Sequence, residues 1–178
     1  GHEAAAGTSG GDAAIVVSTQ DLTEAKSRAL RFLGHRDRSR HEVEERLARY
    51  GYEPSIQKAV VTWLEGLGYL DDARYAEALV AEKRRQGWGP VRIRQELQRR
   101  GVSADLADRV VQSPVCQQDL VDLVIRRFGA LAAADRRLAQ RRACAYLARK
   151  GHEWDVILRV TRTALGAGVE DVGTPEEP

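Results

Sequence analysis

The sequence predicts an all-α protein, and three observations carry this prediction. First, leucine, arginine and glycine recur at steps of fifty residues in the segments Leu47–Gly51, Leu97–Gly101 and Leu147–Gly151. Second, apolar residues four positions apart accompany these segments, which places them on one face of a helix. Third, no stretch alternates apolar and polar residues as a half-buried strand would. The sequence therefore predicts three tandem three-helix repeats, about nine helices in an elongated, curved array.

The first repeat is predicted over residues 22–70. Its first helix covers residues 23–35, where apolar residues four apart form one face. The second helix begins at Ser39, which has a glutamate three residues later and so forms a capping box. It ends at Gly51, because glycine readily takes the left-handed conformation that stops a helix. Pro54 then suits the first turn of the third helix.

The second and third repeats follow the same pattern over residues 71–112 and 113–165. In the second repeat, an aspartate at 71 or 72, Pro90 and Ser103 each mark a helix start. Leu106 and Val110 are four residues apart and are expected to form the apolar stripe of the helix after Ser103. In the third repeat, Ser113–Pro114 is predicted to open the first helix. Apolar residues then continue at helical spacing through this repeat, at Leu120, Val124, Phe128, Ala143, Leu147, Val156 and Val160.

The two ends of the chain differ from the body in composition and charge. Residues 1–21 and 166–178 are rich in small or acidic residues and are predicted to be disordered. The net charge is only +2, yet residues 113–165 carry ten basic and five acidic side chains. No apolar run approaches the roughly 18 to 20 residues of a membrane helix, and no signal peptide is visible. We therefore expect a monomeric, cytoplasmic protein with a basic body and no membrane partner.

Motifs of common enzyme classes are absent from the sequence. There is no GxxxxGK[ST] phosphate loop, no GxSxG nucleophile motif and no HExxH zinc motif. The adjacent carboxylates Asp71 and Asp72 could suggest acid–base chemistry, but capping of the following helix accounts for them. Cys116 and Cys144 lack metal-ligand spacing and are predicted to be small buried hydrophobes. The sequence therefore favours a protein that is not an enzyme and needs no cofactor or metal.

Basic side chains are the remaining candidates for function. Those in the last turn of a helix need no partner, because the helix dipole favours cations there. Basic residues early or in the middle of a helix lack this explanation and point to an acidic or anionic partner. Trp88 lies between two glycines, is hard to bury and is a candidate contact as well. The candidate partner-binding or DNA-binding residues are Arg74, Lys83, Arg84, Arg85, Trp88, Arg92, Arg94, Arg126, Arg127, Arg136, Arg137, Arg141 and Arg142.

A long motif runs through the sequence in fixed order and consists of Ser39, Arg40, Glu42, Leu47, Gly51, Tyr52, Gly68, Tyr69, Leu70, Asp71, Asp72, Arg74, Tyr75, Ala76, Gly89, Pro90, Arg92, Ile93, Glu96, Leu97, Gly101 and Val102. This motif resembles the RecX family of recombination regulators, specifically over residues 24–112 and more weakly over 113–165. This resemblance implies a curved array of three-helix repeats that lies in the groove of the RecA filament on single-stranded DNA. It further implies that the protein suppresses the ATPase, strand exchange and filament growth of RecA.

At the matching positions most of these residues are expected to be structural. Tyr75 is expected in the core and Gly89–Pro90 at a helix start, whereas Arg74 and Arg92 stay open between a buried ion pair and a partner contact. Two functions besides a filament regulator remain: a DNA-binding module with helix-turn-helix-like units, or a purely structural scaffold. The spread of basic residues over several helices disfavours a single recognition helix. Binding to DNA would weaken steeply with salt, which separates these two alternatives.

Overall fold

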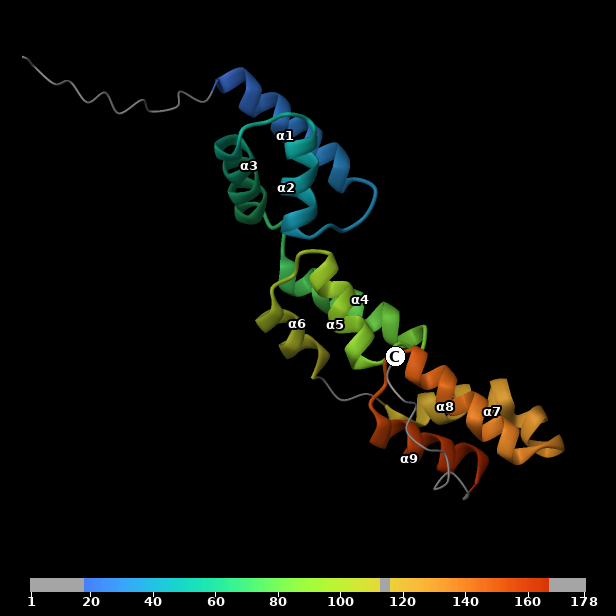
Figure 1. Cartoon of the computed structure of the whole chain (residues 1–178). Coiled ribbons are helices and arrows are strands. Elements are labelled where there is room, and N and C mark those ends of the chain that lie inside the picture. The colour runs from blue at the N-terminus through green and yellow to red at the C-terminus, as the bar shows by residue number, and fades with distance from the viewer. Residues whose placement is uncertain (1–17, 113–115, 167–178) are drawn as a thin grey trace, which may run out of the picture.

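A computed structural model describes residues 18–112 and 116–166, and these ranges contain nine α-helices and no strand. The helices pack in consecutive groups of three, termed unit 1 (α1–α3), unit 2 (α4–α6) and unit 3 (α7–α9). The units follow one another along an elongated array (Figure 1). The predicted all-α array is therefore confirmed. The helices are α1 (Thr19–Leu33), α2 (Arg40–Arg49), α3 (Pro54–Gly66), α4 (Asp72–Arg85), α5 (Pro90–Arg99), α6 (Ala104–Val111), α7 (Gln117–Ala134), α8 (Arg136–Arg149) and α9 (Trp154–Leu165).

The helix starts follow the capping signals of the sequence. The capping box at Ser39 is formed in both directions, and Pro90 occupies the first turn of α5. The first helix begins earlier than predicted, at Thr19, because the Ser18 side chain accepts the N–H of Asp21 and caps it. Residues 18–21 are therefore the start of a helix and not part of a disordered tail. Gly166, the first residue of the predicted C-terminal tail, caps the end of α9. Residues 1–17 and 167–178 of the predicted tails, and the predicted helix start at Ser113–Pro114, lie outside the described residues.

The second helix of every unit ends in the same way. Gly51, Gly101 and Gly151 have φ values of +85°, +78° and +83°, as the fifty-residue repeat predicts. In each case the glycine N–H and the next N–H donate to carbonyls of the last helical turn. This pattern is a Schellman motif, in which glycine tolerates a left-handed conformation that other residues adopt only with strain.

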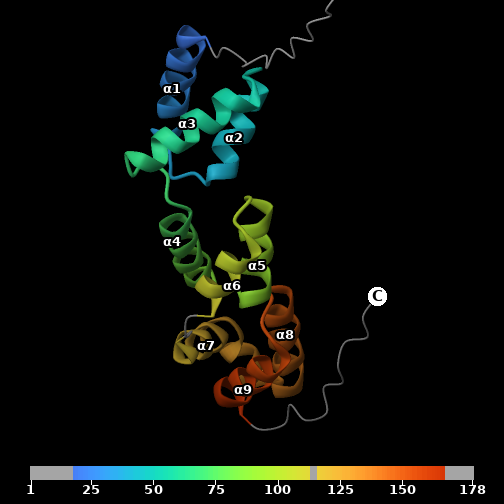
Figure 2. The ribbon, with the colours of Figure 1, turned by 90° about the vertical axis from the view of Figure 1, so that its left-hand side faces the viewer.

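Each unit has its own hydrophobic core, so helix packing occurs within units and the units meet through helix ends. The repeated leucines Leu47, Leu97 and Leu147 are at most 1% exposed and lie at the centre of the three cores. The second helices α2, α5 and α8 lie end to end along the array (Figure 2). The array therefore has a continuous row of helices formed by one helix from each unit.

Two predictions about burial need correction. In α6 the expected core pair Leu106 and Val110 is only half-buried, because the helix packs through a face one residue further along and buries Val111. Cys144 is buried as predicted, but Cys116 is exposed because it caps the start of α7. The prediction of a buried thiol is therefore wrong for Cys116.

Candidate partner-binding surfaces

Three of the predicted contact residues form bonds that stabilise the fold. Arg94 forms an ion pair with Asp108, which links α5 to α6. The half-buried Arg84 donates from Nη2 to the carbonyl oxygen of Val111 over 2.8 Å, and burial lowers the pKa of this guanidinium. The exposed Arg74 donates from Nη2 to a backbone carbonyl in the α3–α4 connection over 3.2 Å. Packing within the array thus explains these positions without a partner.

Trp88 lies at the junction of units 2 and 3, half-buried against the unit 2 core. The guanidinium carbon of Arg92 is 3.9 Å from the centre of its ring, and Nζ of Lys83 is 5.2 Å away. Nη1 of Arg92 also donates to the carbonyl oxygen of Arg149 over 3.3 Å. Arg92 therefore connects two units through a ring and a carbonyl, rather than through a buried ion pair.

A cleft of about 340 Å³ opens beside Trp88, between the end of α4 and the first turns of α7. Arg85 and Arg126 are exposed at this cleft and form no ion pair within the described part of the chain. Asp119 and Asp122 give the cleft mixed charge, so it can receive polar groups of either sign. Its lining residues are Arg84, Arg85, Gly87, Trp88, Cys116, Asp119, Leu120, Asp122, Leu123 and Arg126.

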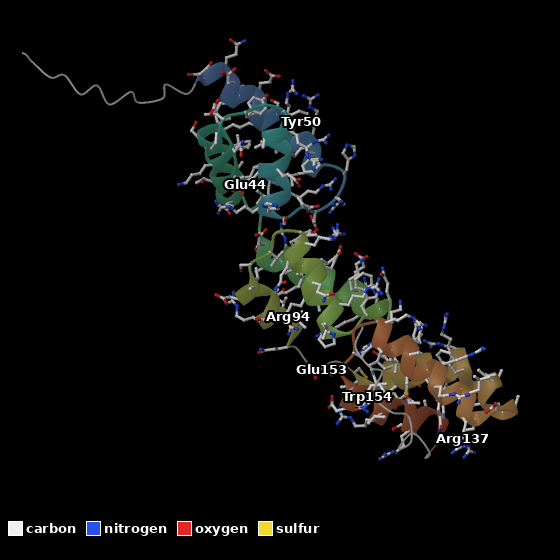
Figure 3. All side chains as sticks on the ribbon, in the orientation of Figure 1. Glu44, Tyr50, Arg94, Arg137, Glu153 and Trp154 are labelled. Atoms are coloured by element: carbon white, nitrogen blue, oxygen red, sulfur yellow. The ribbon has the colours of Figure 1, made fainter. Side chains whose placement is uncertain are left out.

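Helices α7 and α8 carry the largest group of predicted contact residues. The exposed Arg127 lies 4.8 Å from the ring of Tyr146, in a pocket of about 270 Å³ that also contains Arg142. Arg137 lies near the end of the array furthest from unit 1 (Figure 3). The exposed arginines of α8 that form no ion pair among the described residues are Arg136, Arg137, Arg141, Arg142 and Arg149, and the first four are predicted contact residues.

Unit 1 contains a basic site that the sequence interpretation missed. A pocket of about 370 Å³ lies between α1 and the end of α2, and its charged lining groups are all basic. The signal that could have found it is the Arg-x-x-Arg-Phe run at the end of α1, which repeats the Arg-Phe pair found in α7. Its second half comes from α2, and only the tertiary fold joins the two. We term this the unit 1 pocket; it is lined by Arg28, Arg31, Phe32, His35, Arg46 and Tyr50.

The aromatic rings at these sites are already in contact with cations. Arg28 and Arg46 lie 4.7 and 5.0 Å from the ring centre of Tyr50. The ring quadrupole holds both guanidinium groups in place. Arg28 already binds the Glu24 carboxylate through Nε and Nη2. Nε of Arg46 donates to the Tyr50 hydroxyl, so the edge that stays available is the Nη edge of Arg46. Such an edge matches the geometry of carboxylate or phosphate oxygens. These sites can therefore bind oxyanions, whereas a nucleobase would have to displace an arginine before it could stack.

Other kinds of site find no support in the described ranges. Residues 18–112 and 116–166 contain no group of three or more His, Cys, Asp or Glu side chains placed to hold a metal ion. Over the same ranges, no helix combines the length and apolar character needed to cross a membrane. The exposed arginines and the basic pockets are thus the candidate functional surfaces.

Comparison with known proteins agrees with this architecture of tandem three-helix domains. The first and second three-helix domains of RecX match residues 25–64 and 71–111. The regulatory protein RecX of Halorhodospira halophila is 39% identical over 145 residues, covering 80% of this chain and 87% of the relative. That of Stenotrophomonas maltophilia is 40% identical over 138 residues, covering 76% and 83%. The chain belongs to the RecX family, whose members named here are regulatory proteins rather than enzymes.

Solved structures show the same fold. The crystal structure of RecX from Lactobacillus salivarius superposes with a TM-score of 0.73 at 22% identity, covering 82% of this chain and 97% of that one. A second crystal structure of a regulatory protein RecX gives a TM-score of 0.64 at 20% identity, covering 76% and 69%. The arrangement of three-helix units is therefore shared at low sequence identity.

Proposed function

We propose that this chain binds the RecA recombinase filament on single-stranded DNA and inhibits its ATPase, filament growth and strand exchange. Membership of the RecX family is the observation that supports this function most directly. The elongated array adds a physical reason, because a body of several units in a row can contact neighbouring filament subunits at once (Figure 1). Bridging subunits in this way would hinder the rearrangements that ATP turnover requires.

The exposed arginines of α8 supply the electrostatic part of the proposal. Arg141 and Arg142 are adjacent, exposed and without an ion pair in the described part of the chain. Charges in this state steer association and favour acidic faces or DNA phosphates, while contributing little to folding. We therefore assign these arginines to the contact with the filament.

The first test is a titration of the single-stranded-DNA-dependent ATPase of the cognate RecA with the purified chain. We expect inhibition well below one chain per recombinase monomer, because one bound array blocks the growth or turnover of several subunits. An unchanged ATPase at excess chain, with both proteins folded, would contradict the proposed function and leave the family relation as a similarity of fold.

Charge reversal tests the arginines. The double variant Arg141→Glu/Arg142→Glu should weaken filament binding by about tenfold or more, as expected when close charge pairs are lost. The matched control is Lys58→Glu/Arg109→Glu, which makes the same change in net charge at exposed positions on α3 and α6. Circular dichroism should be unchanged in both variants. Equal loss of binding in the control would show that only net charge matters, and an unfolded Arg141→Glu/Arg142→Glu protein would show that these arginines are structural.

Direct DNA binding is the second candidate function, favoured by the excess of exposed arginines on unit 3. Binding through phosphates weakens with salt, with a log–log slope of about −0.9 per neutralised phosphate on duplex DNA and about −0.7 on single strands. Fluorescence anisotropy with labelled oligonucleotides across a salt series measures this slope. A chain that inhibits the recombinase yet shows no DNA binding at low salt would exclude this alternative.

A further inference from the structure

The two junctions between units are built from the same parts. In each, the C-terminal end of a second helix meets the N-terminal end of the second helix in the preceding unit (Figure 2). At the first junction the Ser39 hydroxyl donates to the carbonyl oxygen of Arg100 over 2.5 Å. At the second, the Gly89 N–H donates to the carbonyl oxygen of Lys150 over 2.7 Å. The donors Ser39 and Gly89 occupy equivalent positions of the fifty-residue repeat, and so do the acceptors Arg100 and Lys150. We call the C-terminal end of α5 or α8 an inserted end, and the N-terminal end of α2 or α5 a receiving end.

The chemistry of the two ends explains why the junction can repeat. The Schellman turn directs the chain sideways at Gly101 and Gly151, which leaves terminal carbonyls facing along the helix axis. A receiving helix start presents N–H groups and the positive end of its dipole, so the two ends are complementary. The fit is close: a Cβ added at Gly101 would lie 2.2 Å from Cβ of His41, and one at Gly151 would lie 2.6 Å from Cβ of Arg92.

The C-terminal end of α2 is a third inserted end, and no helix of the described residues receives it. Gly51 has the same left-handed conformation, and the N–H groups of Gly51 and Tyr52 close the same turn over 2.9 and 3.2 Å. A Cβ added at Gly51 would meet nothing within 4 Å in the described chain. Tyr50 stands where Arg100 and Lys150 stand in the other units. It is 40% exposed, at the end of α2 that faces away from unit 2 (Figure 3).

A second copy of this chain is not the expected occupant. Its two receiving ends are filled by its own helices, and unit 3 offers no third one. The position equivalent to Ser39 and Gly89 is Ala139, which is fully buried inside α8 because this helix starts one turn earlier. The start of α8 also carries Arg136 and Arg137, which repel the basic surface of unit 1.

The unit 1 pocket indicates the charge of the occupant. Tyr50 belongs both to the free end of α2 and to this pocket, whose lining includes three arginines, one of which, Arg28, is paired with Glu24 over 2.6 Å. At the first internal junction the receiving helix start supplies a carboxylate in its first turn, that of Glu42, which closes the capping box of α2. A receiving end of the same kind would therefore place a carboxylate against a basic surface.

We propose that the free end of α2, together with the unit 1 pocket, docks onto the N-terminal end of a helix in a protein partner, and that this helix carries a carboxylate in its first turn. The inference that this surface docks a helix start is drawn from the internal junctions and does not need the proposed function. Only the choice of the recombinase filament as the partner rests on the proposed function.

The first experiment needs no recombinase. A stapled helical peptide with the sequence of residues 37–47, which contains the receiving end of α2, is titrated into the isotopically labelled full chain and followed by NMR. We expect saturable shifts of the Gly51 and Tyr52 amides. These shifts should disappear in Arg31→Glu/Tyr50→Glu and persist in the matched control Arg109→Glu/Tyr69→Glu, whose residues are exposed elsewhere. Shifts confined to other residues, or none at the highest peptide concentration, would overturn the proposal.

The second experiment uses the filament. Benzoylphenylalanine replaces Tyr50, the chain is irradiated on the recombinase filament, and cross-linked residues are mapped by mass spectrometry. We expect cross-links to the first turn of a recombinase helix that contains Asp or Glu. Cross-links to DNA, to a second copy of the chain or to other recombinase surfaces, in a chain that still inhibits the ATPase, would overturn the inference and leave the proposed function intact. If the chain neither binds nor inhibits the filament, the proposed function fails and the peptide titration decides the inference.

Discussion

The two junctions of the array have the same geometry and different chemistry. At the junction of units 1 and 2, a side chain receives the inserted end, because the Ser39 hydroxyl donates to Arg100. At the junction of units 2 and 3, the backbone N–H of Gly89 donates to the equivalent carbonyl of Lys150. The Val91 N–H and the Arg92 guanidinium donate to neighbouring carbonyls at the end of α8. The repeat therefore preserves the position of the contact, while each junction satisfies the same carbonyls with different donors.

This difference determines which residues each junction tolerates. A side chain fits at Ser39, whereas a Cβ at Gly89 would lie 2.3 Å from the carbonyl oxygen of Gly151. The second junction is thus tighter at the receiving end. It also has extra bonds, since Lys150 and His152 contact the carbonyls of residues 86 and 87.

The largest effect is expected for Gly89→Ala. The added Cβ would meet backbone atoms of Gly151 and His152, which cannot move aside without opening the junction. We expect a loss of about 2 to 4 kcal/mol in the free energy of unfolding, the range typical of severe overpacking. Urea denaturation followed by circular dichroism measures it, and small-angle scattering should show a wider distribution of unit orientations. Gly129→Ala is the control: its Cβ has ample space inside α7, and the change should stabilise the chain by about 0.5 to 1 kcal/mol.

The next largest effect is expected for two glycine substitutions. Together they separate the strain of a left-handed backbone conformation from the contact at the junction of units 1 and 2. Gly51→Ala forces an alanine into the left-handed conformation without a clash and should destabilise the chain by about 1 to 2 kcal/mol. Gly101→Ala carries the same strain and in addition meets His41, so it should destabilise by about 1 to 2 kcal/mol more. If the two variants lose the same free energy of unfolding in urea denaturation, His41 moves aside without a measurable cost.

These glycines also show what the sequence could and could not predict. A Schellman end depends on local conformation, so the fifty-residue repeat located Gly51, Gly101 and Gly151 correctly. The capping box at Ser39 was predicted for the same reason, but its second bond, to Arg100, depends on a contact between units that periodicity does not encode.

The candidate sites differ in the same way: some depend on local sequence, and others are assembled by tertiary packing. Exposed arginines on α8 could be predicted from their position in the helix. The structural partner of Arg94 and the unit 1 pocket could not, because each is assembled from helices that only tertiary packing brings together. Helical periodicity likewise predicted that α6 is amphipathic, but it did not predict that this helix packs through a face shifted by one residue.

A smaller effect is expected for Ser39→Ala. The hydroxyl caps α2 and donates across the junction, and the residue is fully buried. We expect a loss of about 1 to 2 kcal/mol, near the upper range for an N-cap. Ser103→Ala is the matched control, since Ser103 caps α6 through the N–H of Leu106 at an exposed site, and it should cost about 1 kcal/mol or less. If both variants lose the same stability in urea denaturation, the bond from Ser39 to Arg100 contributes nothing measurable.

The smallest effect is a pH dependence specific to the junction of units 2 and 3. His152 is buried with Nε2 2.9 Å from the carbonyl oxygen of Gly87, and burial lowers the pKa of its imidazole; the Gly87 carbonyl opposes this shift and Lys150 reinforces it. The unfolded chain, with an ordinary histidine pKa of about 6.5, therefore binds a proton before the folded chain does as the pH falls. The stability due to neutral His152 is complete above that value and is lost as the pH falls through the lower, folded pKa.

Urea denaturation of wild type and His152→Gln at pH 7.5 and pH 5.5 isolates this contribution, because every other titrating group is common to both proteins. Stability should fall more on acidification in the wild type than in the variant. Parallel losses would show that the junction opens enough for His152 to be protonated in the folded chain. In that case the tight geometry at Gly89 would not exclude water from His152. The second junction would then be stabilised by its backbone hydrogen bonds rather than by a contact that excludes water.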